Sequence, residues 1–458
     1  MYQLIVILCR YLFVFYAAYF LWQGVAYILS ERAIVNFDRR AAVLKQRLTV
    51  AFLHVTAFLL LAYRPDTWFD PRTLAAGGIG LVLLLLLPFL AGRVYRESCP
   101  LVWNGALFLL DVSVIALERL KPLLAERQLM FIAGGFAALL LIPLFFKLIP
   151  RFEKLELAYL IIGFLALLLP FLGERLLGAL NWVAVGDFSF QPSEVVKFLY
   201  VFYLASVFRK SLRLRQILFP MAASGVMVCV LVLQMDLGAA LIFFMTFLVV
   251  LYISTGRTAL TLAGVAALAA AAVGANRLFP HVQTRVAAWL NPWAIIDSGG
   301  YQITQSLFAI GTWGVWGSGL GRGSPADIPV VTTDFIFSAV CEEFGLLFAL
   351  GLIGVFIMIF YRGVHISLRS RRKYYGLLAA GFTGMLAFQT FLIIGGVIKL
   401  IPMTGVTLPL VSYGGSSVVV CLLMVGILQW IYMHDSKTTE MTQVYTPITA
   451  GQEAETGP

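Results

Sequence analysis

The groups in this 458-residue sequence that could do chemistry are charged and polar residues at the ends of long apolar runs. Residues 191–197 (QPSEVVK) begin one such run, with Glu194 and Lys197 three positions apart. On a helix these two side chains share a face and can pair, so the simpler interpretation is a helix start with one ion pair. The alternative is that Lys197, which lies past the first turn, attracts an anion such as phosphate.

Acidic residues stand out in two further segments. Asp236 lies in a polar break at 234–238 (QMDLG), which is either an exposed turn or part of a site. Asp334 precedes an apolar run, where an aspartate can be a plain helix N-cap. A carboxylate at the mouth of a cavity is also what a general base or a divalent-metal ligand requires. Glu342 and Glu343, two turns further on, need partners inside the protein.

The last polar segment is 402–417, which contains a Pro-Met-Thr-Gly run and ends in Gly-Gly-Ser-Ser. Glycines and serines at such a position permit close helix packing or expose backbone to a polar head group. Both interpretations stay open for Ser416 and Ser417 from the residues alone.

The elements that must position these residues are membrane-spanning helices. Hydrophobic residues make up 61% of the sequence and charged residues only 12%, against roughly a quarter charged in soluble domains. A soluble globule could not bury so much apolar surface, and the composition also excludes disordered and collagen-like chains.

The five cysteines are scattered without CxxC spacing, which supports neither a disulfide framework nor a zinc site. The net charge of +10 is better explained by basic loops between apolar runs than by nucleic-acid binding.

The predicted fold class is therefore an all-α polytopic membrane protein with about 13 transmembrane helices, since each span needs about 20 mainly apolar residues. The predicted spans are 11–30, 49–63, 75–92, 104–118, 128–146, 156–172, 193–208, 217–233, 238–255, 259–275, 335–360, 375–398 and 414–432.

The loops on one side of these spans hold about twice as many Lys and Arg residues as the loops on the other, and basic loops stay in the cytoplasm. This bias predicts a multi-pass protein of the cell membrane with its N-terminus outside and its C-terminus cytoplasmic. The one long loop, 276–333, is then extracytoplasmic, and its many aromatic residues argue against disorder. Part of it, 301–317, is expected to lie along the membrane or dip into the bundle. The polar segments all fall on the outer face, which predicts one extracytoplasmic site.

Several of these segments resemble the signatures of the SEDS family (shape, elongation, division and sporulation proteins), which includes RodA and FtsW. Residues 191–197 resemble its QPSExxK motif, and 402–417 resemble its PxTGxxLPxxSYGGSS signature. The large loop and the helix after it resemble the family at Leu290–Trp293, Gly300–Gln302, Gly317–Gly321, Thr333–Phe337 and Glu342–Gly345. The resemblance covers about 104–433, which would supply the family's ten helices. Residues 1–103, with three predicted spans, form an N-terminal extension, and 434–458 are expected to be a disordered cytoplasmic tail.

The resemblance implies a peptidoglycan glycosyltransferase that polymerises lipid II into glycan strands at the outer face of the membrane, in cell-wall synthesis linked to cell shape, division or sporulation. It implies a class B penicillin-binding protein as transpeptidase partner. The essential acidic loop residue of the family falls on Asp334, as a general base or as the ligand of a divalent cation (Mg or Mn), and its conserved helix lysine falls on Lys197. Substrate binding is then expected from Lys197 with Glu194, and from Gln191, Asp236, Gln302, Ser416 and Ser417.

The sequence also departs from the family pattern. The usual arginine before the conserved Trp in the loop ahead of QPSE is Asn181, a common Asn after Gln389 is replaced by Ile393, and 328–332 lack the frequent Glu and His. Arg175 or Arg285 could substitute for the missing arginine. Two other functions are compatible with the sequence: a lipid II flippase, which should carry polar residues through the full depth of the bundle, and a non-catalytic scaffold for a penicillin-binding protein.

Overall fold

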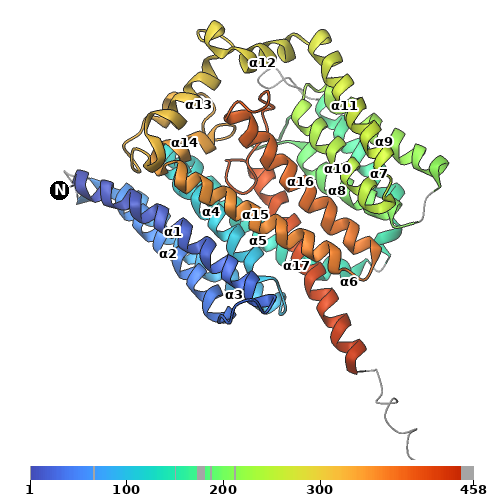
Figure 1. Ribbon diagram of the computed structural model, residues 1–458, viewed down its shortest axis with the longest axis horizontal. Helices are drawn as coiled ribbons and strands as arrows, with labels where there is room; N and C mark the ends of the chain where they lie inside the picture. Colours follow the sequence, from blue (N-terminus) through green and yellow to red (C-terminus); the bar gives the residue numbers. More distant parts are fainter. Residues whose placement is uncertain are drawn as a thin grey trace, which may run out of the picture.

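The structure is a computed structural model that describes residues 2–64, 68–149, 151–172, 181–185, 188–210 and 213–444. Helices dominate these residues and pack side by side in one bundle (Figure 1). The α-helices are α1 (Tyr2–Glu31), α2 (Arg39–Ala62), α3 (Pro71–Val94), α4 (Pro100–Leu120), α5 (Pro122–Leu140), α6 (Ile142–Leu148), α7 (Glu156–Leu168), α8 (Pro192–Phe208), α9 (Leu214–Leu233), α10 (Leu237–Thr255), α11 (Thr258–Leu278), α12 (Pro280–Leu290), α13 (Tyr301–Thr312), α14 (Ile336–Phe344), α15 (Leu346–Arg369), α16 (Lys373–Val397) and α17 (Gly415–Val444).

The remaining elements are short. Two antiparallel hairpins pair β1 (Tyr63–Arg64) with β2 (Trp68–Phe69) and β3 (Val183–Val185) with β4 (Phe188–Phe190). The 3-10 helices are η1 (Phe152–Lys154), η2 (Leu169–Leu172), η3 (Pro292–Ile295), η4 (Gly314–Trp316) and η5 (Pro325–Asp327).

The ends of the long helices follow local sequence rules. Helices α3, α4, α5, α8 and α12 all have a proline in the first turn, where the missing amide proton is not needed. Asp38 and Asp70 cap α2 and α3 by accepting bonds from backbone amides of the first turn. Helix α10 ends at Gly256, whose φ of 64° lies in the left-handed region that favours glycine.

The polytopic helical fold predicted from the sequence is confirmed. Among the described residues, eleven helices are long and apolar enough to cross a membrane, with α5 and α6 together counted as one span. The two other predicted spans coincide with shorter helices, α7 continued by η2 and α8. Helix α17 continues to Val444, past the predicted start of the tail, and 445–458 lie outside the described residues.

The prediction of a single helix over 335–360 is wrong, because the chain breaks at Gly345 into α14 and α15. The amides of Ser318 and Gly319 bond the carbonyls of Glu342 and Glu343 at 2.8 and 3.0 Å, so the last turn of α14 is capped by the long loop. Gly345 has a φ of 90°, and a Cβ there would lie 2.4 Å from the backbone of Trp316. Only glycine permits this crossing.

The long loop contains helices of its own. Helices α12 and α13 form an arch away from the main bundle and lead into α14 (Figure 1). Within the predicted stretch 301–317 the chain forms a helix, α13, which ends at Thr312. We call the end of the bundle that carries 276–335 the loop side. The start of α1 lies on this side, because Arg10 donates to the carbonyl oxygen of Gly317 at 3.3 Å, and the last turns of α17 lie at the opposite end (Figure 1).

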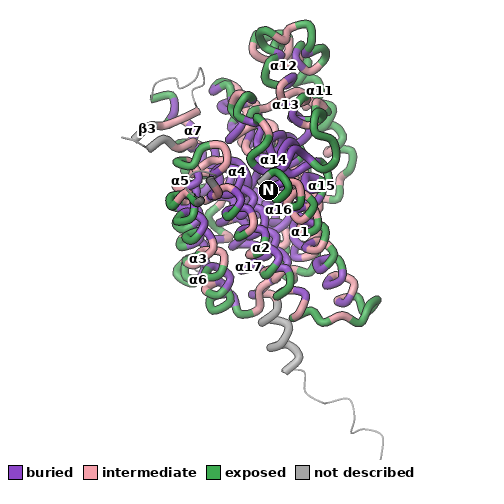
Figure 2. The backbone as a smooth tube through the Cα atoms, turned by 90° about the vertical axis from the view of Figure 1, so that its left-hand side faces the viewer, coloured by how far each residue is buried: buried purple, intermediate pink, exposed green. Residues whose placement is uncertain are grey.

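Helix α4 lies at the centre of the molecule. It is almost entirely buried, whereas α11 has no buried residue, and Figure 2 shows buried residues along the middle of the bundle with exposed ones around them. Helices α1 and α2 cover one flank, where α2 contacts α3 and α4 and α1 contacts α15 (Figure 1). The predicted extension therefore packs directly on the rest of the bundle.

Candidate active site

Asp334 lies on the loop side, two residues before α14, and it lines a cavity of about 90 Å³. The walls come from three parts of the chain: α12, the region of Gly299 and α13, and the segment that follows α16. The lining residues are Thr284, Arg285, Ala288, Trp289, Gly299, Gln302, Ile303, Asp334, Gly396, Lys399, Ile401 and Met403. Gln302 is exposed in the first turn of α13, so this predicted residue does reach the same cavity as Asp334.

Arg285 on α12 is one of two cationic side chains in the lining of this cavity, together with Lys399. Its Nη1 donates to the carbonyl oxygens of Met403 and Thr404 at 3.3 and 3.0 Å, which attaches α12 to the 402–417 segment. Burial lowers the pKa of the Arg285 guanidinium, while the charges of Asp334 and Asp236 oppose that shift. Arg285 therefore stands in the electrostatic field of two carboxylates that are far apart in sequence.

The electrostatics of Asp334 follow from the same burial. Loss of water raises the pKa of its carboxyl, and the Thr333 hydroxyl and the Arg285 guanidinium oppose the shift. Within the part of the chain that the structure describes, no basic group lies within 4 Å of this carboxylate. A half-buried carboxyl of raised pKa that faces a cavity is suited to accept a proton from a ligand.

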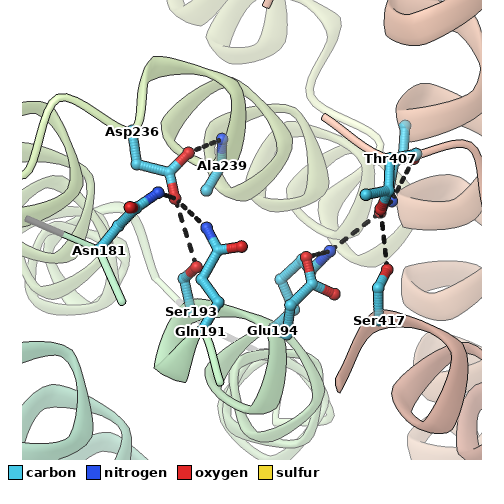
Figure 3. Close-up of polar contacts among 10 residues, drawn as sticks. Asn181, Gln191, Ser193, Glu194, Asp236, Ala239, Thr407 and Ser417 are labelled. Carbon is cyan, nitrogen blue, oxygen red and sulfur yellow. Dashed lines mark hydrogen bonds and ion pairs between the residues drawn. The ribbon is translucent and has the colours of Figure 1, made fainter. Parts of the chain in front are cut away.

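Asp236 joins the start of α8 to the start of α10 (Figure 3). Its Oδ2 accepts hydrogen bonds from Gln191 Nε2 at 2.6 Å, Asn181 Nδ2 at 3.3 Å and Ser193 Oγ at 3.4 Å. Its Oδ1 accepts from the backbone amide of Ala239 at 3.0 Å and so caps α10. The exposed-turn interpretation of Asp236 is wrong, because only 8% of the residue is exposed.

Lys197 and Glu194 form the pair that their spacing predicts. Lys197 Nζ donates to Glu194 Oε1 at 2.8 Å and to Gln389 Oε1 at 3.0 Å, and only 2% of Lys197 is exposed. The network continues into the 402–417 segment, because Gln389 Nε2 donates to the carbonyl oxygen of Thr407 at 2.8 Å. The hydroxyls of Thr407 and Ser417 lie 2.9 Å apart (Figure 3).

The single site that the sequence predicts is therefore divided into two neighbouring charged centres, one formed by Asp334 and Arg285 and the other by Lys197 and Glu194. Lys197 does not line the cavity of Asp334, and the 402–417 segment lies between the two. This segment contacts both: Gly405 lies against Arg285 and Asp334, and Thr407 belongs to the Lys197 network. It is also tied to the residues just before Asp334, since the Tyr413 amide donates to the carbonyl oxygen of Thr332 at 2.9 Å.

The positions of the other predicted residues are simpler to describe. Ser416 lies in the first turn of α17, partly exposed. Glu342 and Glu343 find the partners that they need, since Glu342 Oε1 accepts from the Ser324 amide at 2.7 Å and Glu343 Oε1 from Arg119 Nε at 2.9 Å.

One position where the sequence departs from the SEDS pattern, Asn181, bears on this site. Asn181 bonds Asp236 where an arginine was expected. Of the two arginines named as substitutes, Arg175 lies outside the described residues and Arg285 is in the cavity. The sequence signal for Arg285 was weak, because the amphipathic stretch 280–290 is one of several in the long loop.

A divalent cation finds few protein ligands here. In the described ranges no three His, Cys, Asp or Glu side chains lie close enough together to hold a metal ion. Magnesium often keeps its waters and binds one or two carboxylates together with substrate phosphates. The residues present fit such a cation only with Asp334 as the single protein carboxylate.

Fold and site together define a polytopic helical membrane protein with a half-buried acid and arginine on the loop side. The family model described as "Cell cycle protein", of FtsW, RodA and SpoVE, matches residues 94–437. The chain belongs to this family, as the SEDS signatures predicted. The match begins where α3 ends.

Individual relatives agree with this assignment. The Mycobacterium tuberculosis protein named peptidoglycan glycosyltransferase RodA is 36% identical over 324 residues, which is 66% of this chain and 69% of the relative. Stage V sporulation protein E of Bacillus subtilis is 32% identical over 362 residues, covering 76% of this chain and 94% of the relative. A solved structure described as "Structural coordination of polymerization and crosslinking by a peptidoglycan synthase complex" superposes with a TM-score of 0.65 at 27% identity, covering 74% of this chain and 98% of the other.

Proposed function

We propose that this chain is a peptidoglycan glycosyltransferase that polymerises lipid II into glycan strands on the outer face of the cell membrane. Family membership supports the reaction class, and relatives in the same family are named for this activity. The observation that carries the proposal for this chain is the cavity where the Asp334 carboxyl and the Arg285 guanidinium meet on the loop side.

The chemistry suits these two groups. Chain growth requires a sugar hydroxyl to attack an anomeric carbon while pyrophosphate leaves. Asp334 accepts the proton of that hydroxyl, and burial has already raised its pKa toward the range where a carboxyl serves as a base. Arg285 supplies a fixed positive charge for the anionic part of the substrate. Gln302, exposed at the cavity mouth, offers an amide to a sugar or peptide group.

Lys197 and Glu194 support the site from behind the 402–417 segment. Because Lys197 is already bonded to Glu194 and Gln389, it positions this segment and adds positive potential. Gln191, Asp236 and Ser417 belong to the same supporting structure, and Ser416 stands at its edge.

The orientation follows from the loop charges. We place the loop side and the N-terminus outside and the C-terminus in the cytoplasm. The contact between Arg10 and Gly317 supports the first part, because it holds the start of α1 beside the long loop.

Two further components belong to the proposal. A class B penicillin-binding protein would supply the transpeptidase, in line with the peptidoglycan synthase complex that this fold resembles. As the alternative to acting as the base, Asp334 would hold a divalent cation that the substrate brings, and that cation would neutralise charge on the leaving pyrophosphate.

The test is polymerisation of labelled lipid II by the purified chain with its partner. Asp334→Asn keeps the shape of the side chain but removes the base, so we expect activity to fall by about 10²- to 10⁴-fold. Asp327→Asn is the matched control, since Asp327 is an exposed aspartate of the same loop and its loss should leave activity unchanged. If Asp334→Asn polymerises lipid II at the wild-type rate, Asp334 is not the base.

A further inference from the structure

Helix α4 carries three polar side chains on one face, at Asn104, Asp111 and Glu118. They are seven residues apart, which is close to two helical turns, so they form a row along the helix. All three are buried, with exposed fractions of 0%, 2% and 4%. The row faces α2 and α3, the helices that lie before the family match.

The first two members of the row are bonded by α2. Asn104 Nδ2 donates to Gln46 Oε1 at 3.0 Å, and Asn104 Oδ1 accepts from Arg47 Nε at 3.1 Å. Asp111 Oδ1 lies 2.5 Å from His54 Nδ1, and the other ring nitrogen of His54 lies 2.8 Å from the carbonyl oxygen of Gly77. These bonds join α2 and α3 to α4.

Glu118 is different: both of its carboxylate oxygens are buried, the Thr73 hydroxyl lies near, and among the described residues neither oxygen accepts a hydrogen bond of normal geometry. Glu118 lines a cavity of about 270 Å³ between α2, α3, α4 and α5. The full lining is Leu60, Leu61, Tyr63, Asp70, Arg72, Thr73, Glu118, Arg119, Pro122 and Gly321.

The charge of Arg72 favours an ionised Glu118, but among the described residues no basic group forms an ion pair with it. Arg119 is engaged by Glu343 at 2.9 Å, and Arg72 by Glu126 at 2.7 Å. An isolated carboxylate is costly to bury unless a cation joins it. The cavity lining therefore carries two carboxylates, Glu118 and Asp70, together with the two guanidinium groups of Arg72 and Arg119.

The position of the cavity indicates what could enter. It lies where α2 and α4 end and α3 and α5 begin, so four spans stop at this level. That level is the border between hydrocarbon and water, where lipid head groups lie. Leu60, Leu61 and Pro122 give the wall an apolar part, and Arg119 links the cavity to the long loop by donating to the carbonyl oxygen of Gly323 at 3.0 Å.

We propose that this cavity binds the head group of an amino phospholipid. The primary ammonium donates hydrogen bonds to Glu118, and the lipid phosphate approaches Arg119 and Arg72. A zwitterionic ligand uses both signs of charge, which a simple metal cation would not. The site is separate from the cavity of Asp334, and its argument does not depend on the proposed glycosyltransferase activity.

Native mass spectrometry of the full chain in detergent tests this site. The protein is mixed with equal amounts of phosphatidylethanolamine, phosphatidylglycerol and phosphatidylcholine, and the retained lipids are counted. We expect wild type to retain phosphatidylethanolamine about tenfold better than the other two, because only its ammonium has N–H donors. Glu118→Gln should remove this preference. Asp327→Asn, which changes an exposed carboxylate of the long loop outside the cavity lining, should keep it.

Thermal unfolding separates a lipid site from a structural role. Without added lipid, Glu118→Gln should be at least as stable as wild type, because the amide is easier to bury than an unpaired carboxylate. Phosphatidylethanolamine should raise the Tm of wild type and not of the variant. The proposal is overturned if Glu118→Gln keeps the preference or fails to fold, if the three lipids are retained equally, or if magnesium chloride or free ethanolamine stabilises wild type as well as the lipid does.

Discussion

Two charged centres lie on either side of the 402–417 segment, and they are built in opposite ways. At the first, Lys197 donates to Glu194 and Gln389 and is closed off from water. At the second, Asp334 and Arg285 line a cavity, and among the described residues Arg285 bonds only backbone carbonyls. In the first centre the charged side chains already bond each other, whereas in the second the charges of Asp334 and Arg285 can interact with a ligand.

This difference separates residues that support the structure from residues that can take part in the reaction. A cation that is already paired and buried contributes shape and potential, because moving it to a substrate would break existing bonds. A carboxyl whose pKa is raised by burial and that faces open space can exchange a proton with what enters. The QPSExxK segment, though the most recognisable part of the sequence, therefore belongs to the supporting centre.

The sharpest test of this comparison is Lys197→Met. It leaves Glu194 as a buried carboxylate without its cation, so we expect a loss of about 3–5 kcal/mol in the free energy of unfolding. Thermal or chemical unfolding in detergent measures this, beside Asp334→Asn, which should lose activity and little stability.

The double variant Lys197→Met/Glu194→Gln supplies the control for Lys197→Met. Removing both charges should recover most of the stability. The assignment of Lys197 to support is wrong if Lys197→Met is as stable as wild type but does not polymerise lipid II, since that pattern belongs to a residue that acts on the substrate.

Much of the fold could be predicted from the sequence, because membrane spans depend on local composition. Each of the thirteen predicted spans except 335–360 coincides with a helix or a pair of continuous helices, and the prolines that begin α3, α4, α5, α8 and α12 mark their starts. The Glu194–Lys197 pair was also predictable, since a spacing of three is a property of the helix itself.

Other features depend on contacts between distant segments and could not be predicted. The break at Gly345 exists because residues 316–319 cross it, and a sequence of apolar residues on both sides gives no sign of that crossing. The role of Arg285 depends on α12 lying over the 402–417 segment. The row of Asn104, Asp111 and Glu118 was missed because each is a single polar residue within an apolar helix. The row on α4 adds buried polar groups along a helix to the polar segments that were predicted on the outer face.

Arg285→Gln is the next test of the open centre. Arg285 favours the ionised form of Asp334, so its removal raises the pKa of that carboxyl further. At a given pH less Asp334 is then ionised, and the acid limb of the pH–rate profile should move to higher pH. At neutral pH we expect activity to fall by about 10- to 100-fold, because one charged donor to the substrate is also lost.

The pH profile distinguishes this role from a structural one. Arg285→Lys keeps a positive charge, so it should hold the acid limb near its wild-type position even if the rate falls. An Arg285→Gln profile that drops uniformly at all pH values would show that Arg285 does not act on Asp334.

The smallest expected effect comes from Gly405→Ala, which tests whether the space between the two charged groups is used. A Cβ at Gly405 would lie 3.4 Å from Arg285 Nη2 and 3.5 Å from Asp334 Oδ2, which is ordinary contact and no clash. The φ of 72° at Gly405 makes any side chain costly by about 1 kcal/mol.

Gly256→Ala is the matched control, because Gly256 has a φ of 64° and open space around its Cα. Both variants should lose similar stability, and only Gly405→Ala should slow polymerisation, by a few-fold. If the two variants are equally active, no substrate group passes between Asp334 and Arg285, and the open centre must bind its ligand from the α13 side of the cavity.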